Sequence, residues 1–333
     1  MSDIPMPTEY YTSRYSGEEI DKGIDAAMQL GGASTPQAAL ANLGAAPRTN
    51  LLDNWYFGDP VNQRAETSIH ANGKFLIDRW KIYRYESGTA SLTAGGISLN
   101  GNFDFGITLE SEKIPNIPNQ AVTISVLLGS GELITKTGSL TNDGQIQFIS
   151  VPLDAVSNLQ FIRNWESGKD LFFFQMNGSN VTPVAAKLEL GLTQTLAYQD
   201  EEANWQLFET PDYAAELSTC QRYQIQLNPH LYNIVFIGDA YRGSSGGIWY
   251  LQIPLNTTMR LGSPSFIASD NTIIMLETPK GAFGIQMIGV HGSSGTSITF
   301  SVKCDTVPVD VVSGAVYAID VNAPPSLLLD ANL

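Results

Sequence analysis

The sequence predicts a mainly β protein, in which a short helical N-terminal segment precedes two antiparallel β-sandwich domains with jelly-roll-like strand spacing. Three observations predict this fold class. From residue 51 onward, short runs rich in β-branched and aromatic residues are separated by Gly, Asn and Pro. Helical periodicity is limited to residues before 50 and to one short segment after residue 210. The chain has 333 residues and is 43% hydrophobic, which is enough for more than one core.

Charge and cysteine content narrow the function classes. The formal net charge is −15, and residues 1–50, 51–209 and 210–333 each carry an acidic excess. The basic surface that nucleic acid or anionic lipid requires is therefore missing. No apolar run approaches the roughly 20 residues of a membrane helix, and the N-terminus lacks the pattern of a secretory signal. The two cysteines, Cys220 and Cys304, favour buried reduced thiols of a protein assembled in a cytosol over a disulfide.

Residues 1–50 are predicted to attach the protein to another molecule. Ser16 and Glu19 form the S-x-x-E capping box that begins a helix. Ile20, Ile24 and Met28 then lie on one face of this helix, which ends at a Gly-Gly pair. A helix of roughly 15 residues is marginal alone in water. Its apolar face must pack on the chain's own β-structure or, as we favour, on other copies or a larger assembly, because residues 33–49 form a spacer behind it.

The stretch NLLDNWYFGDPVNQR, residues 50–64, marks the change from helix to β-structure. Its leucines and its Trp-Tyr-Phe run crowd together and need a packed surface to bury them. We expect this stretch to be the first strand or the opening loop of a sandwich.

The first β domain is predicted over residues 51–209. Turn signals such as Asn100-Gly101 and Asn177-Gly178 separate its apolar runs. Strands are expected at residues 75–85, 97–109, 120–128, 144–151, 158–165 and 171–177.

The second β domain is predicted over residues 210–333. It begins with a short helix after Pro211, where Tyr213, Leu217 and Cys220 have helical spacing. Two Gly/Ser-rich loops, residues 238–247 and 291–296, either present a binding surface or are simple hairpin tips. Strands are expected at residues 232–237, 248–253, 265–268, 272–276, 284–290, 296–302 and 315–321.

Four motifs carry a resemblance to a known group of proteins. They are ASTPQAALANLGAA (33–46), NLLDNWYFGDPVNQR followed by IDRW (50–64 and 77–80), AAKLELGLTQTLAYQD (185–200) and PDYAAELSTCQRYQ (211–224). Together they resemble the linker, the two ends of a jelly-roll module and the start of the C-terminal domain in tail-fibre and receptor-binding proteins of tailed bacteriophages and prophages. Where that family follows Cys-Gln-Arg-Tyr with another aromatic residue, this chain has Gln224.

This resemblance implies a homotrimeric virion appendage, assembled in the host cytoplasm, that docks on other particle proteins through residues 1–50. The jelly roll would be a spacer or a carbohydrate-binding-like module, and residues 210–333 would bind a host cell-surface polysaccharide. In a trimer, Ile20, Ile24 and Met28 would pack against two other copies as in a short coiled coil. Two alternatives stay open: a head fibre or capsid decoration protein, and a glycan-cleaving tail protein.

The residues themselves predict neither an enzyme nor a cofactor or metal site. His70, His230 and His291 are the only histidines and lack metal-ligand spacing. No nucleophile elbow, P-loop or dinucleotide fingerprint occurs. Appendages that cleave capsule are usually long parallel β-helices, and this chain lacks the internal repeat that such a solenoid needs.

A non-catalytic recognition site is predicted in the second β domain. Sugar rings stack on aromatic faces, and their hydroxyls pair with carboxylates, amides and Arg. Trp249 and Tyr250 are adjacent in an expected strand, so only one of them can face the core. The alternative is that these residues pack in a core and a trimer interface. The predicted receptor-binding or glycan-binding residues are Asp239, Tyr241, Arg242, Trp249, Tyr250 and His230.

Overall fold

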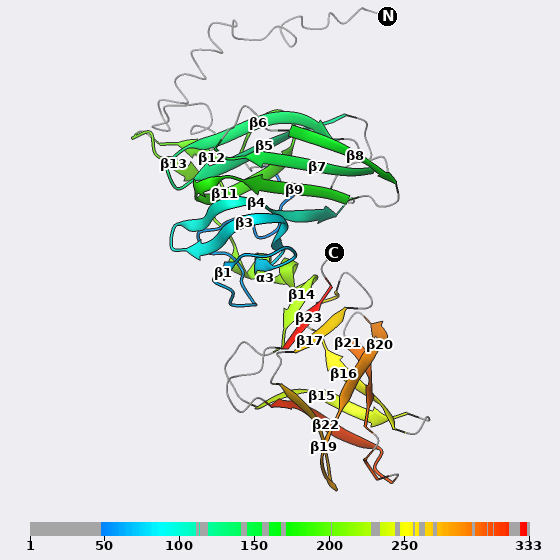
Figure 1. The fold of residues 1–333 in the computed structure, drawn as a ribbon. Helices are drawn as coiled ribbons and strands as arrows, with labels where there is room; N and C mark the ends of the chain where they lie inside the picture. Colours follow the sequence, from blue (N-terminus) through cyan, green and yellow to red (C-terminus); the bar gives the residue numbers. More distant parts are fainter. Residues whose placement is uncertain are drawn as a thin grey trace, which may run out of the picture.

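The computed structural model describes residues 48–331, apart from 111–112, 114–118, 141–144, 155–159, 168–170, 201, 228–233, 244–246, 256, 260–263, 269–271, 295–296, 305, 309 and 320–326. The chain is mainly β in this part, as predicted, and forms two bodies, one on each side of a short helix (Figure 1). The predicted N-terminal helix with Ile20, Ile24 and Met28 lies outside the described residues.

The first body contains thirteen strands. They are β1 (Ser68–Ile69), β2 (Phe75–Ile77), β3 (Trp80–Thr93), β4 (Gly96–Glu110), β5 (Gln120–Leu128), β6 (Leu133–Leu140), β7 (Gln145–Pro152), β8 (Gln160–Ser167), β9 (Leu171–Asn177), β10 (Ser179–Val181), β11 (Pro183–Leu190), β12 (Ala197–Gln199) and β13 (Trp205–Leu207).

Two sheets and a small hairpin make up this body. The eight-stranded sheet has the order β1-β3-β4-β9-β7-β8, with β2 paired to β3 and β10 to β4. The three-stranded sheet has the order β11-β5-β6, and β12 pairs with β13. Strands β7 and β9 are parallel, so the prediction of a wholly antiparallel sandwich is wrong at this pair. Strand β7 lies between β9 and β8 in the sheet. Strand β8 follows β7 in sequence and pairs antiparallel with it, and the next strand, β9, pairs with the other edge of β7.

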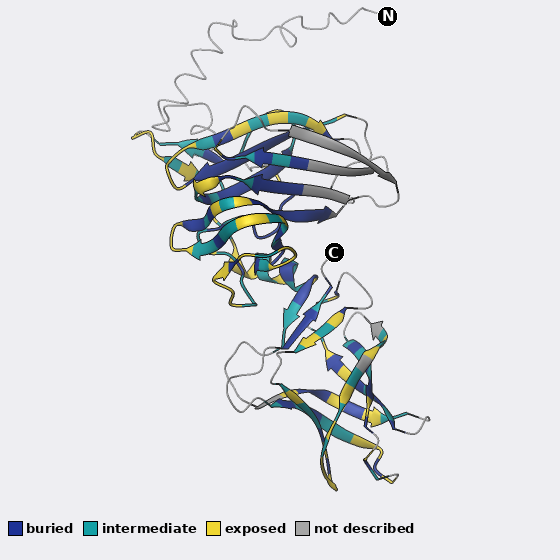
Figure 2. Cartoon of the chain, viewed as in Figure 1, coloured by how far each residue is buried: buried dark blue, intermediate teal, exposed yellow. Residues whose placement is uncertain are grey.

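Trp80 lies at the centre of the first core. Its ring packs edge-on against Phe57 and Phe174, with centroids 4.9 and 5.9 Å away, and stacks on Phe105 at 5.6 Å. Its indole Nε1 donates to the Asp53 carbonyl at 2.9 Å. The buried tryptophan therefore ties the opening stretch to the eight-stranded sheet. Buried side chains of both sheets join the same core, which Figure 2 shows in dark blue.

The opening stretch, residues 50–64, is an irregular segment that runs beside β11, so the opening-loop alternative is the correct one. The Leu51 amide donates to the Leu188 carbonyl at 2.8 Å, and the Ala186 amide donates to the Trp55 carbonyl at 3.0 Å. These bonds satisfy the backbone of the segment without a regular ladder.

The expected single strand over residues 75–85 is instead a hairpin. Asp78 and Arg79 form its two-residue turn, since Ile77 pairs with Trp80. Arg79 has a φ of 74°, in the left-handed region that reverses the chain. The prediction failed here because the turn has no Gly, Asn or Pro beside Asp78, and burial of both side chains holds it.

The second body begins at helix α3 (Tyr213–Gln221), which lies where the sequence predicts a helix. The Asp212 carboxylate caps it by accepting from the Ala214 and Ala215 amides at 3.0 and 3.1 Å. The strands are β14 (Gln224–Gln226), β15 (Ile234–Arg242), β16 (Ile248–Pro254), β17 (Ser265–Ala268), β18 (Ile273–Thr278), β19 (Gly281–Gly284), β20 (Gln286–Ser294), β21 (Ser297–Lys303), β22 (Ser313–Ile319) and β23 (Leu327–Asp330).

These strands form two sheets around a second core. The larger sheet has the order β19-β18-β22-β15-β16-β21-β20, and the smaller has the order β14-β23-β17. Phe266 of the smaller sheet packs against Phe300 of the larger at 5.7 Å. Cys220 and Cys304 are both buried and free, which confirms the predicted reduced thiols.

Parts of two segments expected to be loops, residues 238–242 and 291–294, belong to strands. Strand β15 continues through Arg242, and β20 continues through Ser294. Gly238 lies where a Cβ atom would come 2.1 Å from the Gln252 carbonyl oxygen, so this glycine permits close strand pairing at a bulge. Gly238 therefore marks an irregular position within a strand, and the sequence prediction of a loop at this residue is wrong.

The two bodies meet through polar contacts around β14. The Arg64 guanidinium donates to the Gln224 side-chain oxygen and pairs with Asp330 at 3.0 Å. The Arg79 guanidinium lies 3.4 Å from the ring centroid of Tyr223. The opening stretch and the β2–β3 turn thus hold both β14 and β23 of the second body, next to α3 in Figure 1.

Candidate functional site

The larger sheet of the second body has one buried and one outer face. Along β16, Trp249, Leu251 and Ile253 are buried in the core, whereas Tyr250 and Gln252 between them point to the outer face. The outer face therefore presents side chains from β15, β16 and their neighbours.

An aromatic row crosses one end of this outer face. Tyr241 on β15 is the register partner of Tyr250 on β16, and their ring centroids are 5.4 Å apart at an interplanar angle of 43°. The Tyr250 ring lies 4.3 Å from the ring of His291 on β20. We call Tyr241, Tyr250 and His291 the aromatic row. Tyr241 is 49% exposed, so its ring can contact a ligand.

Strand β21 separates Tyr250 from His291, and small residues let the two rings approach across it. Ser301 is the register partner of Tyr250, and Gly289 is the register partner of Ser301. A bulge between Val290 and Gly292 then displaces His291 from regular pairing. The sequence placed His291 in a loop, so its part in the row was missed.

A polar pair lies one step along the same strands. Asp239 and Gln252 are register partners and are both exposed. Together with Phe236, Gly238, Pro254 and Ser297 they line a shallow groove of about 250 Å³. The Gln252 amide donates to the Ser297 hydroxyl at 3.1 Å. Within the described residues the Asp239 carboxylate has no hydrogen-bond partner, so it is available to accept from a ligand.

Apolar side chains gather at the opposite end of the outer face. Phe236 and Tyr317 are register partners with ring centroids 5.7 Å apart, and Met275 pairs with Tyr317 from the other side. Phe236 is 51% exposed, and Ile273 beside them is 55% exposed. We call Phe236, Tyr317, Met275 and Ile273 the apolar end. Apolar surface gathered in this way is typical of an interaction site.

The structure brings three of the six predicted site residues together: Asp239, Tyr241 and Tyr250. Trp249 lies fully buried in the core. The Arg242 guanidinium donates to the carbonyls of Val307, Pro308 and Val311 and lies over the Trp249 ring at 5.5 Å. Those contacts hold the segment between β21 and β22 in place.

Trp249 and Arg242 therefore lie on the core side of the sheet or bond to the backbone, so the prediction that they contact a ligand is wrong. His230 lies outside the described residues.

The described residues contain no group of three or more His, Cys, Asp or Glu that could hold a metal ion. The acidic segment that starts at Asp200 is a tight turn instead, in which the Asp200 carboxylate accepts from the Asn204 amide at 2.8 Å. In the part of the chain that the structure describes, no helix has the length and apolar character needed to cross a membrane.

Comparisons with protein-family models, with curated proteins and with solved structures found no match to this chain. The function is therefore argued from the residues themselves.

Proposed function

We propose that this chain is a virion appendage protein of a tailed bacteriophage, a tail fibre or receptor-binding protein, that binds a glycan of the host cell surface. The observation that carries this proposal is the aromatic row, whose rings face outward beside a free carboxylate. The four sequence motifs and the acidic, mainly β chain agree with it.

A sugar would bind by stacking and by hydrogen bonds. The apolar face of a pyranose ring stacks on an aromatic ring, for which Tyr241 and Tyr250 are available. Its hydroxyl groups would then lie within reach of Asp239 and Gln252, one step along the strands. Two residues along a strand correspond to about 6.6 Å, at roughly 3.3 Å per residue. A second sugar unit would extend along the groove toward Ser297.

The binding test uses fluorescently labelled full chain and a panel of Gram-positive and Gram-negative bacterial cells. We expect the wild type to bind at least one strain, and Tyr241→Ala and Tyr250→Ala each to weaken that binding about five- to tenfold, since a lost stacking partner costs about 1–1.4 kcal/mol. Tyr213→Ala is the control, because Tyr213 is 47% exposed and lies on α3. Unchanged binding by both site variants would exclude the aromatic row.

The proposal includes a homotrimer that docks on the particle through residues 1–50. The apolar end supports self-association, because a neighbouring copy would remove Phe236 and Ile273 from water. Light scattering should give about three times the chain mass of 36.1 kDa. Ile273→Ser should lower that mass at micromolar concentration, whereas Ile267→Ser, with Ile267 45% exposed on the smaller sheet, should not. A monomeric wild type would contradict the trimer.

A further inference from the structure

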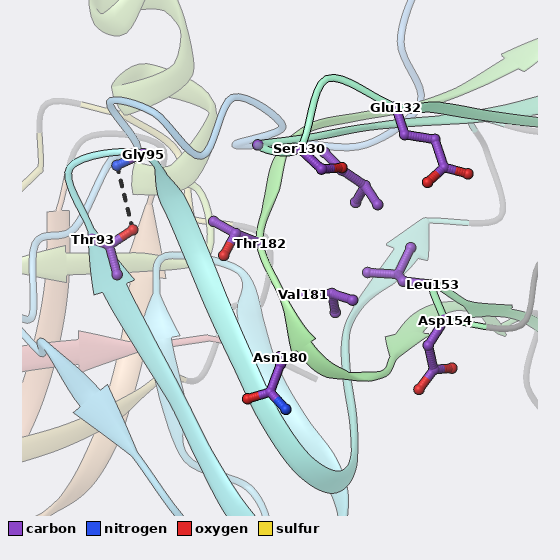
Figure 3. Close-up of a pocket in the computed structure, with 11 residues that line it drawn as sticks. Thr93, Gly95, Ser130, Glu132, Leu153, Asp154, Asn180, Val181 and Thr182 are labelled. Carbon is purple, nitrogen blue, oxygen red and sulfur yellow. Dashed lines mark hydrogen bonds between the residues drawn. The ribbon is translucent and has the colours of Figure 1, made fainter.

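A large pocket lies in the first body, far in sequence from the aromatic row. It has a volume of about 650 Å³ and lies where turns of both sheets meet (Figure 3). The β3–β4 turn, the β5–β6 turn, the residues after β7 and the segment from β10 to β11 each contribute to its wall. The lining residues are Thr93, Gly95, Leu128, Gly129, Ser130, Glu132, Leu153, Asp154, Asn180, Val181 and Thr182.

The pocket combines an apolar floor with a polar rim. Leu128 and Leu153 are buried, and Val181 packs partly against the same core. Figure 3 shows Glu132 and Asp154 on one side of the pocket and Thr93 across from them. A small apolar floor with a few polar groups around it is the usual construction of a ligand site, and the volume lies within the roughly 300–1,000 Å³ of such sites.

Several rim groups are free to bind. Within the described part of the chain, the side chains of Glu132 and Asn180 have no hydrogen-bond partner. Asp154 accepts one bond, from the Ser179 amide at 3.3 Å, and keeps further acceptor capacity. The Thr93 hydroxyl, by contrast, is engaged with Gly95 and Gly96 in its own turn. The free groups are therefore mainly acceptors.

Asn180 lines the pocket at an irregular point of β10. Asn180 has a φ of 58°, in the left-handed region. It lies between Ser179 and Val181, where the pairing of β10 with β4 shifts register. Bulges of this kind re-aim a side chain, often beside functional sites. Asn tolerates this conformation better than most residues, so the position suits an amide that contacts a ligand.

The lining residues also disfavour two classes of ligand, anions and flat aromatic molecules. Among the described lining residues, two are carboxylates and none is Lys or Arg, which disfavours phosphates, uronic acids and other anions. These lining residues also include no aromatic ring, so flat aromatic ligands lack a stacking partner there. A ligand with many hydroxyl donors and modest apolar patches satisfies both the carboxylates and the floor.

We infer that this pocket binds a short neutral saccharide, which deepens and rests on the proposed function as a glycan-binding appendage. Carboxylate and amide oxygens of Glu132, Asp154 and Asn180 would accept from its hydroxyls, and the Leu128–Leu153 floor would contact its apolar face. The first body would then be a second recognition unit and not only a spacer.

The experiment uses the full chain and saturation-transfer NMR with trisaccharides of glucose, mannose and N-acetylglucosamine, and with the trimer of galacturonic acid. We expect at least one neutral trisaccharide to bind and the acidic one not to bind. Glu132→Ala should weaken neutral binding at least about tenfold, as expected for a lost hydrogen bond to a charged group, and Asn180→Gly should weaken it about two- to tenfold, as expected for a lost neutral hydrogen bond.

Matched controls make the same changes elsewhere. Glu202→Ala removes an exposed carboxylate, and Asn119→Gly replaces an exposed asparagine that also has a positive φ, of 54°. Both should bind like the wild type. The inference is overturned if no neutral trisaccharide binds, if both pocket variants bind normally, or if the acidic trisaccharide binds equally well.

The same assay separates this inference from the proposed function. If Tyr241→Ala abolishes trisaccharide binding and the pocket variants do not, the sugar binds on the aromatic row and the pocket inference fails. If the pocket variants abolish trisaccharide binding while the tyrosine variants leave cell binding unchanged, the pocket stands and the aromatic row fails.

Discussion

Asp78 is a buried acid at the meeting point of the two bodies. Its carboxylate accepts from the backbone and side chain of Gln63 and from the side chain of Gln224. Burial raises the pKa of Asp78 from its usual 3.8 to about 6, although the hydrogen bonds from Gln63 oppose that rise. The folded protein therefore holds a proton between about pH 4 and pH 6 that the unfolded chain has released.

This shift predicts a pH-dependent stability. As pH rises through that window, Asp78 contributes less to the free energy of unfolding, because the folded state must ionise a buried group. Relative to Asp78→Asn, the wild type should lose on the order of 2 kcal/mol between pH 4 and pH 7. Urea unfolding at several pH values measures this difference. Asp59→Asn, a substitution of the same kind at an exposed position, is the control. A difference between wild type and Asp78→Asn that stays constant with pH would contradict the assignment.

At the scale of elements, the pairing of β15 with β16 sets the geometry of the aromatic row. Gly238 allows the two strands to approach, since a Cβ atom there would lie 2.1 Å from the Gln252 carbonyl oxygen. Any larger residue must push the strands apart next to Asp239 and Tyr241. Gly238 thus determines the position of the binding residues by its lack of a side chain.

Gly238→Ala should therefore lower both stability and binding. We expect a loss of about 1–3 kcal/mol in the free energy of unfolding, typical of overpacking, together with weaker cell binding. Gly284→Ala is the control, because nothing lies within 4 Å of a Cβ atom at that position. Thermal unfolding and the cell-binding assay measure the two effects. Wild-type behaviour of Gly238→Ala would show that the strands can adjust freely.

Elements with strong local signals could be predicted from the sequence. Helix α3 was predicted from the helical spacing of Tyr213, Leu217 and Cys220 after Pro211. Trp249 and Tyr250 divided between core and outer face as strand alternation requires. The hairpin at Asp78 and Arg79 was missed because Asp78 alone is a weak turn signal, and the left-handed Arg79 is held by buried tertiary contacts.

The aromatic row and the pocket of the first body also differ in how far the sequence could predict them. Tyr241 and Tyr250 are nine positions apart and belong to neighbouring strands, so the sequence could group them. His291 joins them only because β21 and β20 follow β16 in the sheet order. The pocket could not be predicted at all, since Thr93, Glu132 and Asn180 meet only through the topology of two sheets.

At the scale of the whole molecule, the junction determines how the second body is held on the first. Arg64 joins three structural units there: it donates to Gln224 of β14, pairs with Asp330 of β23, and lies 4.6 Å from the ring centroid of Phe75 on β2. Its side chain is only 17% exposed. Its loss removes these three contacts across the junction.

Arg64→Ala should loosen the junction without unfolding either body. We expect a larger maximum dimension in small-angle scattering and faster protease cleavage between the bodies, as hydrogen bonds to a charged group contribute about 1.5–3 kcal/mol each. Arg84→Ala is the control, because Arg84 is 59% exposed and its ion pairs among the described residues, with Glu86 and Asp104, lie within the first body. Identical scattering from Arg64→Ala and the wild type would assign the rigidity of the junction to other contacts.

The junction also determines how tension travels through the molecule. A force applied to the outer face of the larger sheet acts on β15. The covalent chain transmits it toward the first body through β14, which has three residues. Strand β14 pairs antiparallel with β23, and Arg64 bonds to a side chain on each of these strands. The load is therefore shared by side-chain bonds and a strand pair, so the covalent link between the bodies does not carry it alone.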